Sequence, residues 1–387
     1  MIYELRIYHC VTGRLPALLK RFETTTLELW KRHGIRQAGF WTVLVGDGGN
    51  QDLHYLLAWE SLAERETKWN KACRKRARRA DRRLDQKHVP AAHGVLGGEV
   101  TAMPRGLDHV VHAVRDLEAA AELYRRLGFT VGTRNQHSWG THNHLVQLPG
   151  FFLELLTVAE PQKLGSDGLS ALFGTFNRVF LKHRQGLSLL ILESEDAAAD
   201  ATRFRSAAIG VSDAMHFERE GKRPDGAPTK VGFSLAFARD AKAPAIGFAV
   251  CQQHFPENFW NSAFQQHPNT ASAIGSVVLV AENPTDHHIF LSAFTGIRDL
   301  SATSSGITVS TPRGDIRVMD PAAFRSHFGT EPPDISHGAR LAAVQFRVRD
   351  RAALNAALKA GGIAASSRMG ATIVAPETAI GATLVFD

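Results

Sequence analysis

Two histidines and one glutamate occupy positions where apolar residues would be expected. His109 and His112 interrupt the apolar strand pattern of GLDHVVHAVRD, and Glu154 lies inside FFLELL. Because side chains alternate along a strand, His109 and His112 are expected on opposite faces, while Glu154 shares its face with Phe152 and Leu156. A carboxylate among apolar neighbours needs a partner, since burying an unpaired charge is costly. Either a hydrogen-bonded core pair or a bound cation would supply that partner.

A second group of imidazoles lies in HSWGTHNHLV, between the first histidines and Glu154. The glycine and threonine of this stretch predict a tight turn into a strand. Imidazole suits general acid and base work near neutral pH. We take His137 and His144 as candidate catalytic groups, with a structural role as the alternative for each of them.

Aromatic residues gather in the stretch HFPENFWNSAFQQHPN, residues 254–269. Phe255, Phe259, Trp260 and Phe264 lie within it. We interpret the stretch either as an aromatic lid over a ligand cleft or as a connector packed into the core.

The histidines belong to a unit that recurs four times after Gly106. Each copy has an apolar strand that ends at an acidic or amide residue, then a helix, then a glycine about a dozen residues later. The four copies begin with HVVHAVRD, SLLILESED, SVVLVAEN and AVQFRVRD. Strand-like segments follow each helix, such as FTVGTR, HNHLVQL and FFLELLTV in the first copy. The pattern predicts four βαβββ modules.

Four such modules resemble the vicinal oxygen chelate superfamily, which includes glyoxalase I, extradiol dioxygenases and bleomycin-resistance proteins. The resemblance is carried by LDHVVHAVRDLEAAAELYRRLGF, HSWGTHNHLVQL and FFLELL, which are locally most similar to glyoxalase-like domains. It implies an α+β fold in which modules pair into half-open barrels. We expect modules one and two to pair within residues 106–270, and modules three and four within residues 271–387.

In this superfamily a metal ion sits in the cleft of a module pair, held by residues of the first and last strands. The resemblance places His109 at the first-strand ligand position and Glu154 at the last-strand position of module one. Ser188 stands where a further ligand would lie, and serine is a poor ligand for most divalent metals. We therefore take His254, at the end of the last strand of module two, as the third ligand. Such a set suits Fe(II), Mn(II) or catalytic Zn(II).

The resemblance then implies a metal-dependent enzyme that acts on a small oxygenated organic molecule. In this chemistry the metal chelates adjacent oxygens and stabilises the charge that develops on them. With two histidines and one glutamate as ligands, we expect dioxygenase-type oxidation or cleavage. Glyoxalase-type isomerase or lyase chemistry is one alternative, and a protein that only binds and sequesters a small molecule is another. Modules three and four lack the ligand set and are expected to be degenerate.

The first hundred residues predict a different domain. Alternation in MIYELRIYHC, RQAGFWTVLVG and LHYLLAW indicates strands. Helices are expected over residues 13–34 and from Ser61, where Ser61 and Glu64 form a capping box. With a last strand near GVLGGEVTAM, the order is ferredoxin-like. The segment 1–103 resembles the NIPSNAP family, whose domains are similar to dimeric α/β-barrel proteins. This resemblance implies a homodimer formed through that segment.

Composition limits the remaining possibilities. The chain has 387 residues, of which 44% are hydrophobic and 21% charged, as in ordinary multidomain globular proteins. Its formal net charge is +7, and much of the excess lies in RKRARRADRR, residues 74–83. We interpret this run as a solvated helix face, because no nucleic-acid-binding signature accompanies it. Scattered cysteines, no signal-peptide pattern and no long apolar run predict a cytoplasmic protein without membrane or nucleic-acid partners.

Overall fold

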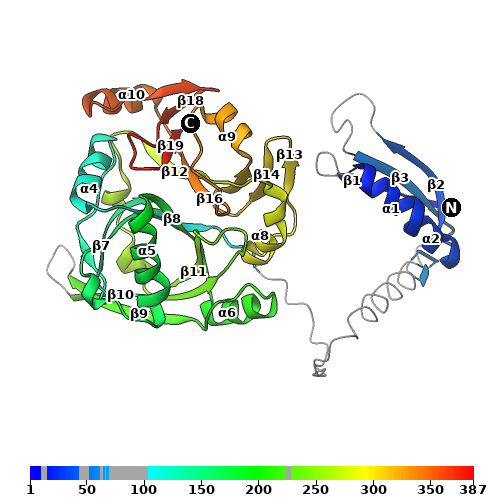
Figure 1. Cartoon of the computed structure of the whole chain (residues 1–387), viewed down its shortest axis with the longest axis horizontal. Helices are drawn as coiled ribbons and strands as arrows, with labels where there is room; N and C mark the ends of the chain where they lie inside the picture. Colours follow the sequence, from blue (N-terminus) through cyan, green and yellow to red (C-terminus); the bar gives the residue numbers. More distant parts are fainter. Residues whose placement is uncertain (10–14, 43–51, 62–63, 66, 69–102, 223–227) are drawn as a thin grey trace. The chain divides into compact units, whose positions relative to one another are not determined.

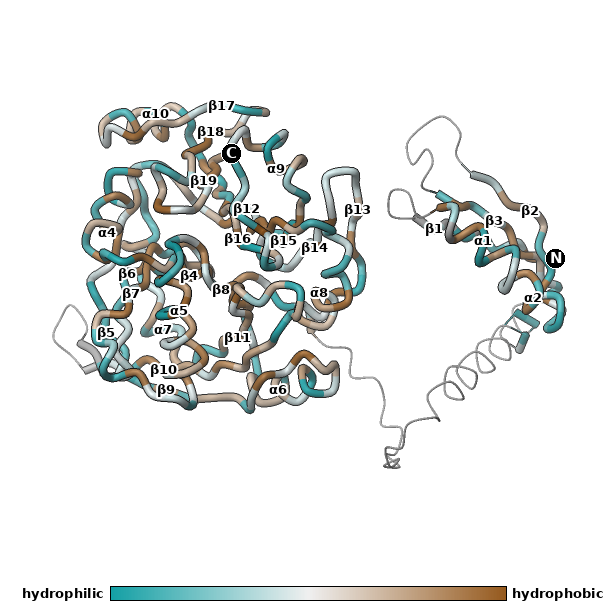
Figure 2. The backbone as a smooth tube through the Cα atoms, viewed as in Figure 1, coloured by the Kyte–Doolittle hydropathy of each residue, from teal (hydrophilic) through white to brown (hydrophobic). Residues whose placement is uncertain are grey.

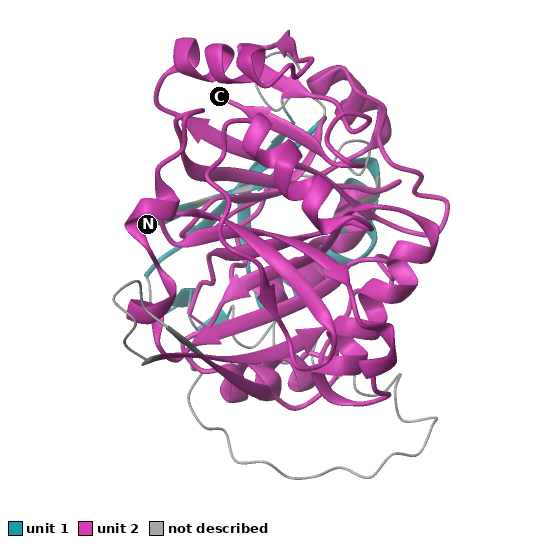
Figure 3. Cartoon of the chain, turned by 90° about the vertical axis from the view of Figure 1, so that its left-hand side faces the viewer, with its two compact units in different colours: residues 1–100, 302–304 teal, residues 101–301, 305–387 magenta. Residues whose placement is uncertain are grey.

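The computed structural model describes residues 1–387 except 10–14, 43–51, 62–63, 66, 69–102 and 223–227. The chain divides into two compact units, residues 1–100 with 302–304 and residues 101–301 with 305–387 (Figure 3). The first hundred residues form a three-stranded sheet, and the residues from Thr101 onward form two eight-stranded sheets. Among the described residues, no helix has both the length and the apolar character that a membrane span requires.

The small sheet consists of β1 (Ile2–His9), β2 (Arg36–Thr42) and β3 (Asp52–Trp59), all antiparallel, in the order β1-β3-β2. The chain between β1 and β2 is helical, with α1 (Leu15–Arg21), a π-helical segment (Phe22–Thr26) and α2 (Leu27–His33). Gly34 ends α2 at φ 63°, a left-handed C-cap that favours glycine. The predicted strand–helix–strand–strand order is confirmed.

The predicted second helix begins as its sequence indicates. Ser61 Oγ accepts a hydrogen bond from the Glu64 N–H at 3.1 Å, which is the expected capping contact. The remainder of that helix, the basic run 74–83 and the predicted last strand lie outside the described residues.

One face of the small sheet packs on its helices, and the other carries exposed aromatic residues. Phe22 and Trp30 contact Tyr55 of β3, each with a ring-centroid distance of 5.4 Å. Tyr3 pairs with Ala58 of β3, and Trp41 pairs with His54 of β3. The side chains of these two β3 residues point to the face opposite that of Tyr55, so Tyr3 and Trp41 lie on the other face of the sheet. They are 58% and 50% exposed, respectively.

The first eight-stranded sheet contains modules one and two (Figure 1). Its strands in spatial order are β5 (Asn135–Gln136), β6 (Thr141–Leu148), β7 (Phe151–Val158), β4 (Leu107–Ala113), β8 (Gly186–Glu193), β11 (Gly247–Gln253), β10 (Pro228–Ala238) and β9 (Met215–Lys222). The modules meet at the antiparallel pair β4–β8. Within each module the first strand runs parallel to the last, β4 with β7 and β8 with β11.

Helices follow the first strands as the repeat predicts. They are α4 (Leu117–Arg126) after β4 and α6 (Ala197–Ser206) after β8. Asp116 and Asp196 are their N-caps, and each carboxylate accepts a backbone N–H three residues later. The connection from β7 to β8 contains a 3-10 turn (Pro161–Lys163), a π-helical segment (Ser170–Thr175) and α5 (Phe176–His183). After β11 come α7 (Pro256–Phe259) and a 3-10 turn (Ser262–Gln265).

Modules three and four build the second sheet with the same topology. Its strands in spatial order are β13 (Ser301–Thr303), β14 (Gly306–Ser310), β15 (Asp315–Met319), β12 (Ala271–Val280), β16 (Arg340–Val348), β19 (Thr383–Phe386), β18 (Ala371–Val374) and β17 (Ser366–Arg368). Its helical segments are a 3-10 turn (Pro284–His287), α8 (His288–Thr295), α9 (Pro321–Phe328) and α10 (Arg351–Ala360). The predicted paired four-module architecture is confirmed.

A single apolar core joins the two large sheets. It includes Val110 and Leu190 of the first sheet and Val277 and Val344 of the second. Figure 2 shows apolar stretches along the strands at the centre of this unit. The first sheet buries a separate apolar cluster on its other face, which includes Val111. Alternation along each strand therefore divides its residues between the shared core and this second face.

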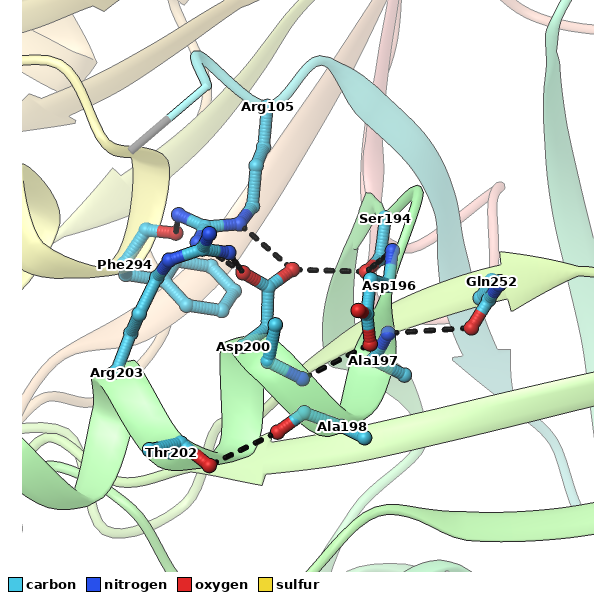
Figure 4. Close-up of polar contacts among 11 residues, drawn as sticks. Arg105, Ser194, Asp196, Ala197, Ala198, Asp200, Thr202, Arg203, Gln252 and Phe294 are labelled. Carbon is cyan, nitrogen blue, oxygen red and sulfur yellow. Dashed lines mark hydrogen bonds and ion pairs between the residues drawn. The ribbon is translucent and has the colours of Figure 1, made fainter. Parts of the chain in front are cut away.

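A buried ion pair ties the start of module one to modules two and three (Figure 4). Arg105, just before β4, bonds the Asp200 carboxylate of α6 through Nη2 and through Nε at 3.0 Å. Asp200 also accepts from Ser194 Oγ and from Arg203. Arg105 Nη1 donates to the Phe294 carbonyl oxygen of α8 at 3.0 Å. Burial raises the pKa of Asp200, but the hydrogen bonds and charge of Arg105 bring it below its ordinary value.

His112 joins module one to module four. Its Nε2 donates to the Ile380 carbonyl oxygen at 2.9 Å, so Nδ1 accepts from the Tyr124 hydroxyl at 2.9 Å. The side chain is fully buried, and burial lowers its pKa to about 4. The neutral imidazole thus satisfies two buried polar groups that a valine at this position would leave unpaired.

Candidate active site

A cavity with about 540 Å³ of empty space, part of it open to solvent, lies on the face of the first sheet that is turned away from the shared core. Strands of both modules and the two connections after β7 and β11 surround it. Six of its fifteen lining residues are Phe or Trp: Trp139, Phe152, Phe173, Phe217, Phe233 and Phe259. The cavity belongs to modules one and two, where the sequence predicts the site.

Two imidazoles lie flat against aromatic rings of this wall. His109 stacks on Phe152 with a centroid distance of 4.2 Å and an interplanar angle of 13°. His137 stacks on Trp139 at 4.6 Å and 7°. The stacking fixes the ring planes, so that each imidazole presents a nitrogen edge rather than a face to its polar neighbours.

A buried carboxylate orients His109. The pairing of β4 with β8 shifts register between Leu107 and His109, and this irregularity brings Asp108 beside the next side chain. His109 Nδ1 lies 2.6 Å from Asp108 Oδ1, and Gln253 Nε2 donates to Asp108 Oδ2 at 2.9 Å. Because a carboxylate only accepts, the proton of a neutral His109 is on Nδ1. Its Nε2 then carries a lone pair.

Glu154 faces that lone pair. Its Oε2 lies 4.0 Å from His109 Nε2, and its Oε1 accepts from Asn143 Nδ2 at 2.5 Å. Burial raises the pKa of Glu154, although the charges of His109 and Arg219 and the hydrogen bond from Asn143 lower it in part. Since Oε1 is occupied as an acceptor, a proton on this carboxyl group belongs on Oε2, the oxygen turned toward His109.

A chain of amides connects Glu154 to Arg219, another residue that lines the cavity. Arg219 Nη1 donates to Asn135 Oδ1 at 2.6 Å, and Asn135 Nδ2 donates to Asn143 Oδ1 at 3.0 Å. Arginine can only donate, so it sets the direction of every bond in this chain. Burial lowers the pKa of Arg219, and the nearby Glu154 acts in the opposite direction.

The equivalent positions of module two are apolar. Val114 N–H donates to the Leu156 carbonyl oxygen in module one, and Ser194 N–H donates to that of Cys251 in module two. These two contacts are equivalent, so Val114 corresponds to Ser194 and Leu156 corresponds to Cys251. Counting back by the same number of residues along each strand makes Leu189 the counterpart of His109 and Ala249 the counterpart of Glu154. Both lie in the apolar cluster next to the cavity. The counterpart of His109 is therefore Leu189 and not Ser188, whose hydroxyl donates to Asn177 Oδ1 at 2.8 Å.

His254 does not reach the cavity. Its Nε2 lies 2.8 Å from Ser234 Oγ. Ser234 stands between Phe233 and Leu235 on β10, and both of these neighbours line the cavity. Alternation therefore places Ser234 and His254 on the opposite face of the sheet. The structure brings together His109 and Glu154 from the predicted metal set, but not His254. In the part of the chain that the structure describes, no three His, Cys, Asp or Glu side chains are arranged to hold a metal.

The two candidate catalytic histidines lie on different faces of the first sheet. His137 lines the cavity, with Nδ1 2.9 Å from Thr141 Oγ1. Burial lowers its pKa to about 3, helped by the charge of Arg219, so its imidazole is neutral at ordinary pH. His144 points away from the cavity: its Nδ1 donates to the Gly132 carbonyl oxygen at 2.7 Å.

The aromatic stretch after β11 contributes one wall of the cavity. Phe259 lines it, and its ring lies 5.1 Å from that of Phe152. Gln147 of β6 holds this segment in place, because its Nε2 donates to the Phe259 carbonyl oxygen and its Oε1 accepts from the Asn261 N–H. Phe255 and Phe264 are not among the lining residues.

Three residues that build the site were not among the predicted site residues: Asp108, Asn135 and Arg219. Asp108 was visible as an acid next to the proposed histidine, but strict alternation assigns it to the other face. Arg219 lies in MHFEREGK, flanked by Glu218 and Glu220, and alternation from Phe217, which sets it on the same face as that apolar ring, is the signal that could have found it.

Comparisons with known proteins agree with the two-part organisation. A NIPSNAP family model matches residues 3–88, and the model of a glyoxalase-like domain matches residues 107–295. No curated protein matches the chain. Among solved structures, a hypothetical protein from Staphylococcus aureus is 15% identical and has a TM-score of 0.52, over 73% of this chain and 99% of its own. This likeness concerns the fold alone.

Two weaker structural likenesses carry no argument about function. A mutant of 4-hydroxymandelate synthase from Streptomyces coelicolor is 12% identical over 69% of this chain and 78% of its own, with a TM-score of 0.42. A fusion of a xylose isomerase-like TIM barrel with 4-hydroxyphenylpyruvate dioxygenase is 13% identical over 79% of this chain and 52% of its own, with a TM-score of 0.43. The two family matches agree with the predicted fusion of a NIPSNAP-like segment with a glyoxalase-like region.

Proposed function

We propose that this protein is an enzyme that transfers a proton on a small oxygenated organic molecule, the isomerase or lyase type of chemistry. The observation that carries the proposal is the pair formed by His109 Nε2 and Glu154 Oε2, which face each other in the cavity at 4.0 Å. One nitrogen is free to accept a proton, and burial raises the pKa of the opposing carboxyl group. A base and an acid therefore flank the same small space.

His109 is the proposed base. A C–H group next to a substrate carbonyl gives its proton to Nε2, and the electron pair of the broken bond moves toward the carbonyl oxygen. Asp108, held by the Gln253 amide, stabilises the imidazolium that results. General base catalysis of this kind contributes roughly 10²–10⁴-fold in rate.

Glu154 is the proposed acid. Its Oε2 proton passes to the carbonyl oxygen as negative charge develops there, and the substrate becomes an enol. Asn143 stays bonded to Oε1 throughout and stabilises the carboxylate that forms. Where the substrate carries a C=C bond next to the deprotonated carbon, the enol is a dienol. Return of the His109 proton to the far carbon of this dienol, with return of the hydroxyl proton to Glu154, moves the double bond and restores both groups.

Metal-dependent oxidation, the reaction expected from the superfamily, is the second candidate function. The His109–Glu154 pair supports it, since both are good ligands. The rest of the site does not fit a resident divalent metal. Leu189 and Ala249 replace the ligands of module two, and the Arg219 guanidinium adds a positive charge to the same cavity. The proposed proton transfer needs only groups of this chain.

Exchange of carbon-bound hydrogen with solvent tests the proposal. Phenylacetone in deuterium oxide serves as a neutral probe, and proton NMR follows the loss of its C–H signal next to the carbonyl. We expect the full chain, dialysed against EDTA, to accelerate exchange above the buffer rate. His109→Ala should abolish the acceleration, while His254→Ala, a histidine on the outer face, should retain it.

Two results would count against this function. Acceleration that disappears on dialysis and returns with iron, manganese or zinc would favour the metal-dependent candidate. Binding of the probe without any exchange would favour a protein that only sequesters its ligand.

A further inference from the structure

We infer that the ligand of this cavity is a flat aromatic acid whose anionic oxygen pairs with Arg219. The inference deepens the proposed function and rests on its assignment of the cavity as the substrate site. It does not depend on which reaction follows. Two independent features carry it, the position of one arginine and the arrangement of the aromatic wall.

Arg219 is directed into the cavity by strand geometry. On β9, Phe217 and Arg219 both line the cavity, and they pair in register with Phe233 and Val231 of β10. The residues between them, such as Glu218, alternate to the outer face. The guanidinium is therefore part of an otherwise aromatic and aliphatic wall on this side of the cavity.

Most N–H groups of the Arg219 guanidinium make no hydrogen bond to the described residues. Within the described residues, its one hydrogen bond runs from Nη1 to Asn135 Oδ1 at 2.6 Å, and no carboxylate lies within ion-pair distance. An arginine carries five N–H donors in a planar fork that matches a carboxylate. The Arg219 side chain is half-buried in this wall, and an anionic partner would offset the partial desolvation of its charge. An anionic group of the ligand supplies that partner.

From Phe217, beside Arg219, a continuous series of aromatic rings runs along the cavity. Trp139 contacts Phe217 at 5.0 Å, and Phe217 stacks on Phe233 at 5.3 Å and 29°. Phe233 meets Phe259 edge-on at 5.4 Å, and Phe259 lies 5.1 Å from Phe152. Offset and edge-on contacts at such distances are the arrangement that aromatic rings prefer. A flat aromatic ligand extends this series, whereas a sugar or a polyol leaves its hydroxyl groups without partners.

The same geometry places the reacting end of the ligand. Arg219 and the His109–Glu154 pair lie at opposite ends of the amide chain through Asn135 and Asn143. An acid held at Arg219 with its ring along the aromatic wall reaches toward His109, which is stacked on the last ring of the series, Phe152.

Equilibrium binding of matched probes tests the inference. The probes are naphthoate, its neutral amide, and cyclohexanecarboxylate, and the readout is tryptophan fluorescence or calorimetry on the full chain. We expect wild-type protein to bind naphthoate roughly 10- to 100-fold more tightly than the amide, since hydrogen bonds to a charged group carry that much selectivity. Naphthoate should also bind more tightly than cyclohexanecarboxylate.

Variants assign the selectivity to one residue. Arg219→Met should lose the preference for acid over amide, and Arg219→Lys should keep part of it. Arg125→Met, which removes an arginine of α4 with a side chain 45% exposed, should behave as wild type. Equal binding of acid and amide, failure of naphthoate to bind, or a full acid preference in both Arg219 variants would overturn the inference. The lysine variant decides the matter if the methionine variant does not fold.

The test separates this inference from the proposed reaction. His109→Ala should keep the acid preference while losing exchange on phenylacetone. Arg219-dependent binding of naphthoate in a protein without exchange activity would refute the reaction and leave the ligand class standing. Exchange activity in a protein that binds acid and amide equally would refute the ligand class and leave the reaction standing.

Discussion

The Nε2 atom of His109 and the Oε2 atom of Glu154 lie 4.0 Å apart across a cavity that both residues line. This separation is too long for a hydrogen bond. Each group is instead oriented by a hydrogen bond at its other polar atom. His109 Nδ1 bonds Asp108, and Glu154 Oε1 bonds Asn143. The two side chains are therefore positioned by the protein, and both line the cavity, where a ligand can approach them.

Asp108 should matter for the reaction and not for binding. Asp108→Asn replaces an obligatory acceptor by an amide that can donate to Nδ1, which would move the imidazole proton to Nε2 and block the base. We expect the exchange rate on phenylacetone to fall by roughly 10²–10⁴-fold, the contribution of a general base. Naphthoate binding should change little. An exchange rate within twofold of wild type would contradict the orienting role of Asp108.

His112 should make stability depend on pH. Its folded pKa of about 4 lies below the ordinary 6.5, so the unfolded chain binds this proton first as the pH falls. Stability is therefore full above pH 6.5 and decreases between pH 6.5 and 4. The loss is on the order of 3 kcal/mol, at about 1.36 kcal/mol for each pH unit.

Urea denaturation at several pH values measures this effect. His137 contributes in the same direction, so the comparison is between wild type and His112→Phe. The variant should be less stable at pH 7, because it leaves the Ile380 carbonyl oxygen unpaired, and should lose less stability on acidification. Parallel curves for the two proteins would show that His112 is not the titrating group.

Removing one partner of the Arg105–Asp200 pair should lower the free energy of unfolding strongly. Arg105→Ala leaves a buried carboxylate with less compensation, and loss of one partner of a buried pair costs about 3–5 kcal/mol. Arg203 contacts the same carboxylate but is 39% exposed, so Arg203→Ala should cost about 1 kcal/mol or less. Equal urea midpoints for the two variants would contradict this difference.

We propose that the NIPSNAP domain forms a homodimer through the sheet face that carries Tyr3 and Trp41. These side chains are 58% and 50% exposed, and exposed aromatic residues on one face mark interaction surfaces. Sedimentation equilibrium of the full chain should give a dimer at micromolar concentration, and Tyr3→Glu with Trp41→Glu should give a monomer. A monomeric wild-type protein, or a dimer unaffected by both changes, would refute this interface.

The architecture could be predicted because its signals are local and repeated. Asp116, Asp196 and Asp350 each cap a helix directly after an apolar strand, and the structure places all three as N-caps. The repeated order of elements then leaves little freedom in topology. The domain limits at 103–106 and 270–271 stay predictions.

The site was predictable only where strands alternate clearly. Glu154 stands alone among apolar residues, and its face followed correctly from Phe152. In β11, by contrast, Ala249, Val250 and Cys251 are all buried, so the sequence does not indicate which residues face the cavity. His254 was expected in the cavity for this reason, whereas the structure places it with Ser234 on the opposite face of the sheet. The irregularity of β4 hid Asp108 in the same way, since an alternation rule cannot foresee a shift in register.

The protonation state of Glu154 tests the central claim most directly. Infrared difference spectra between wild type and Glu154→Gln, recorded on the EDTA-dialysed full chain at neutral pH, separate a protonated carboxyl group from a carboxylate. Because burial raises the pKa of Glu154 while its Oε1 accepts from Asn143, we predict the band of a protonated carboxyl group. The band of an ionised carboxylate at neutral pH would contradict the assignment of Glu154 as the acid opposite His109.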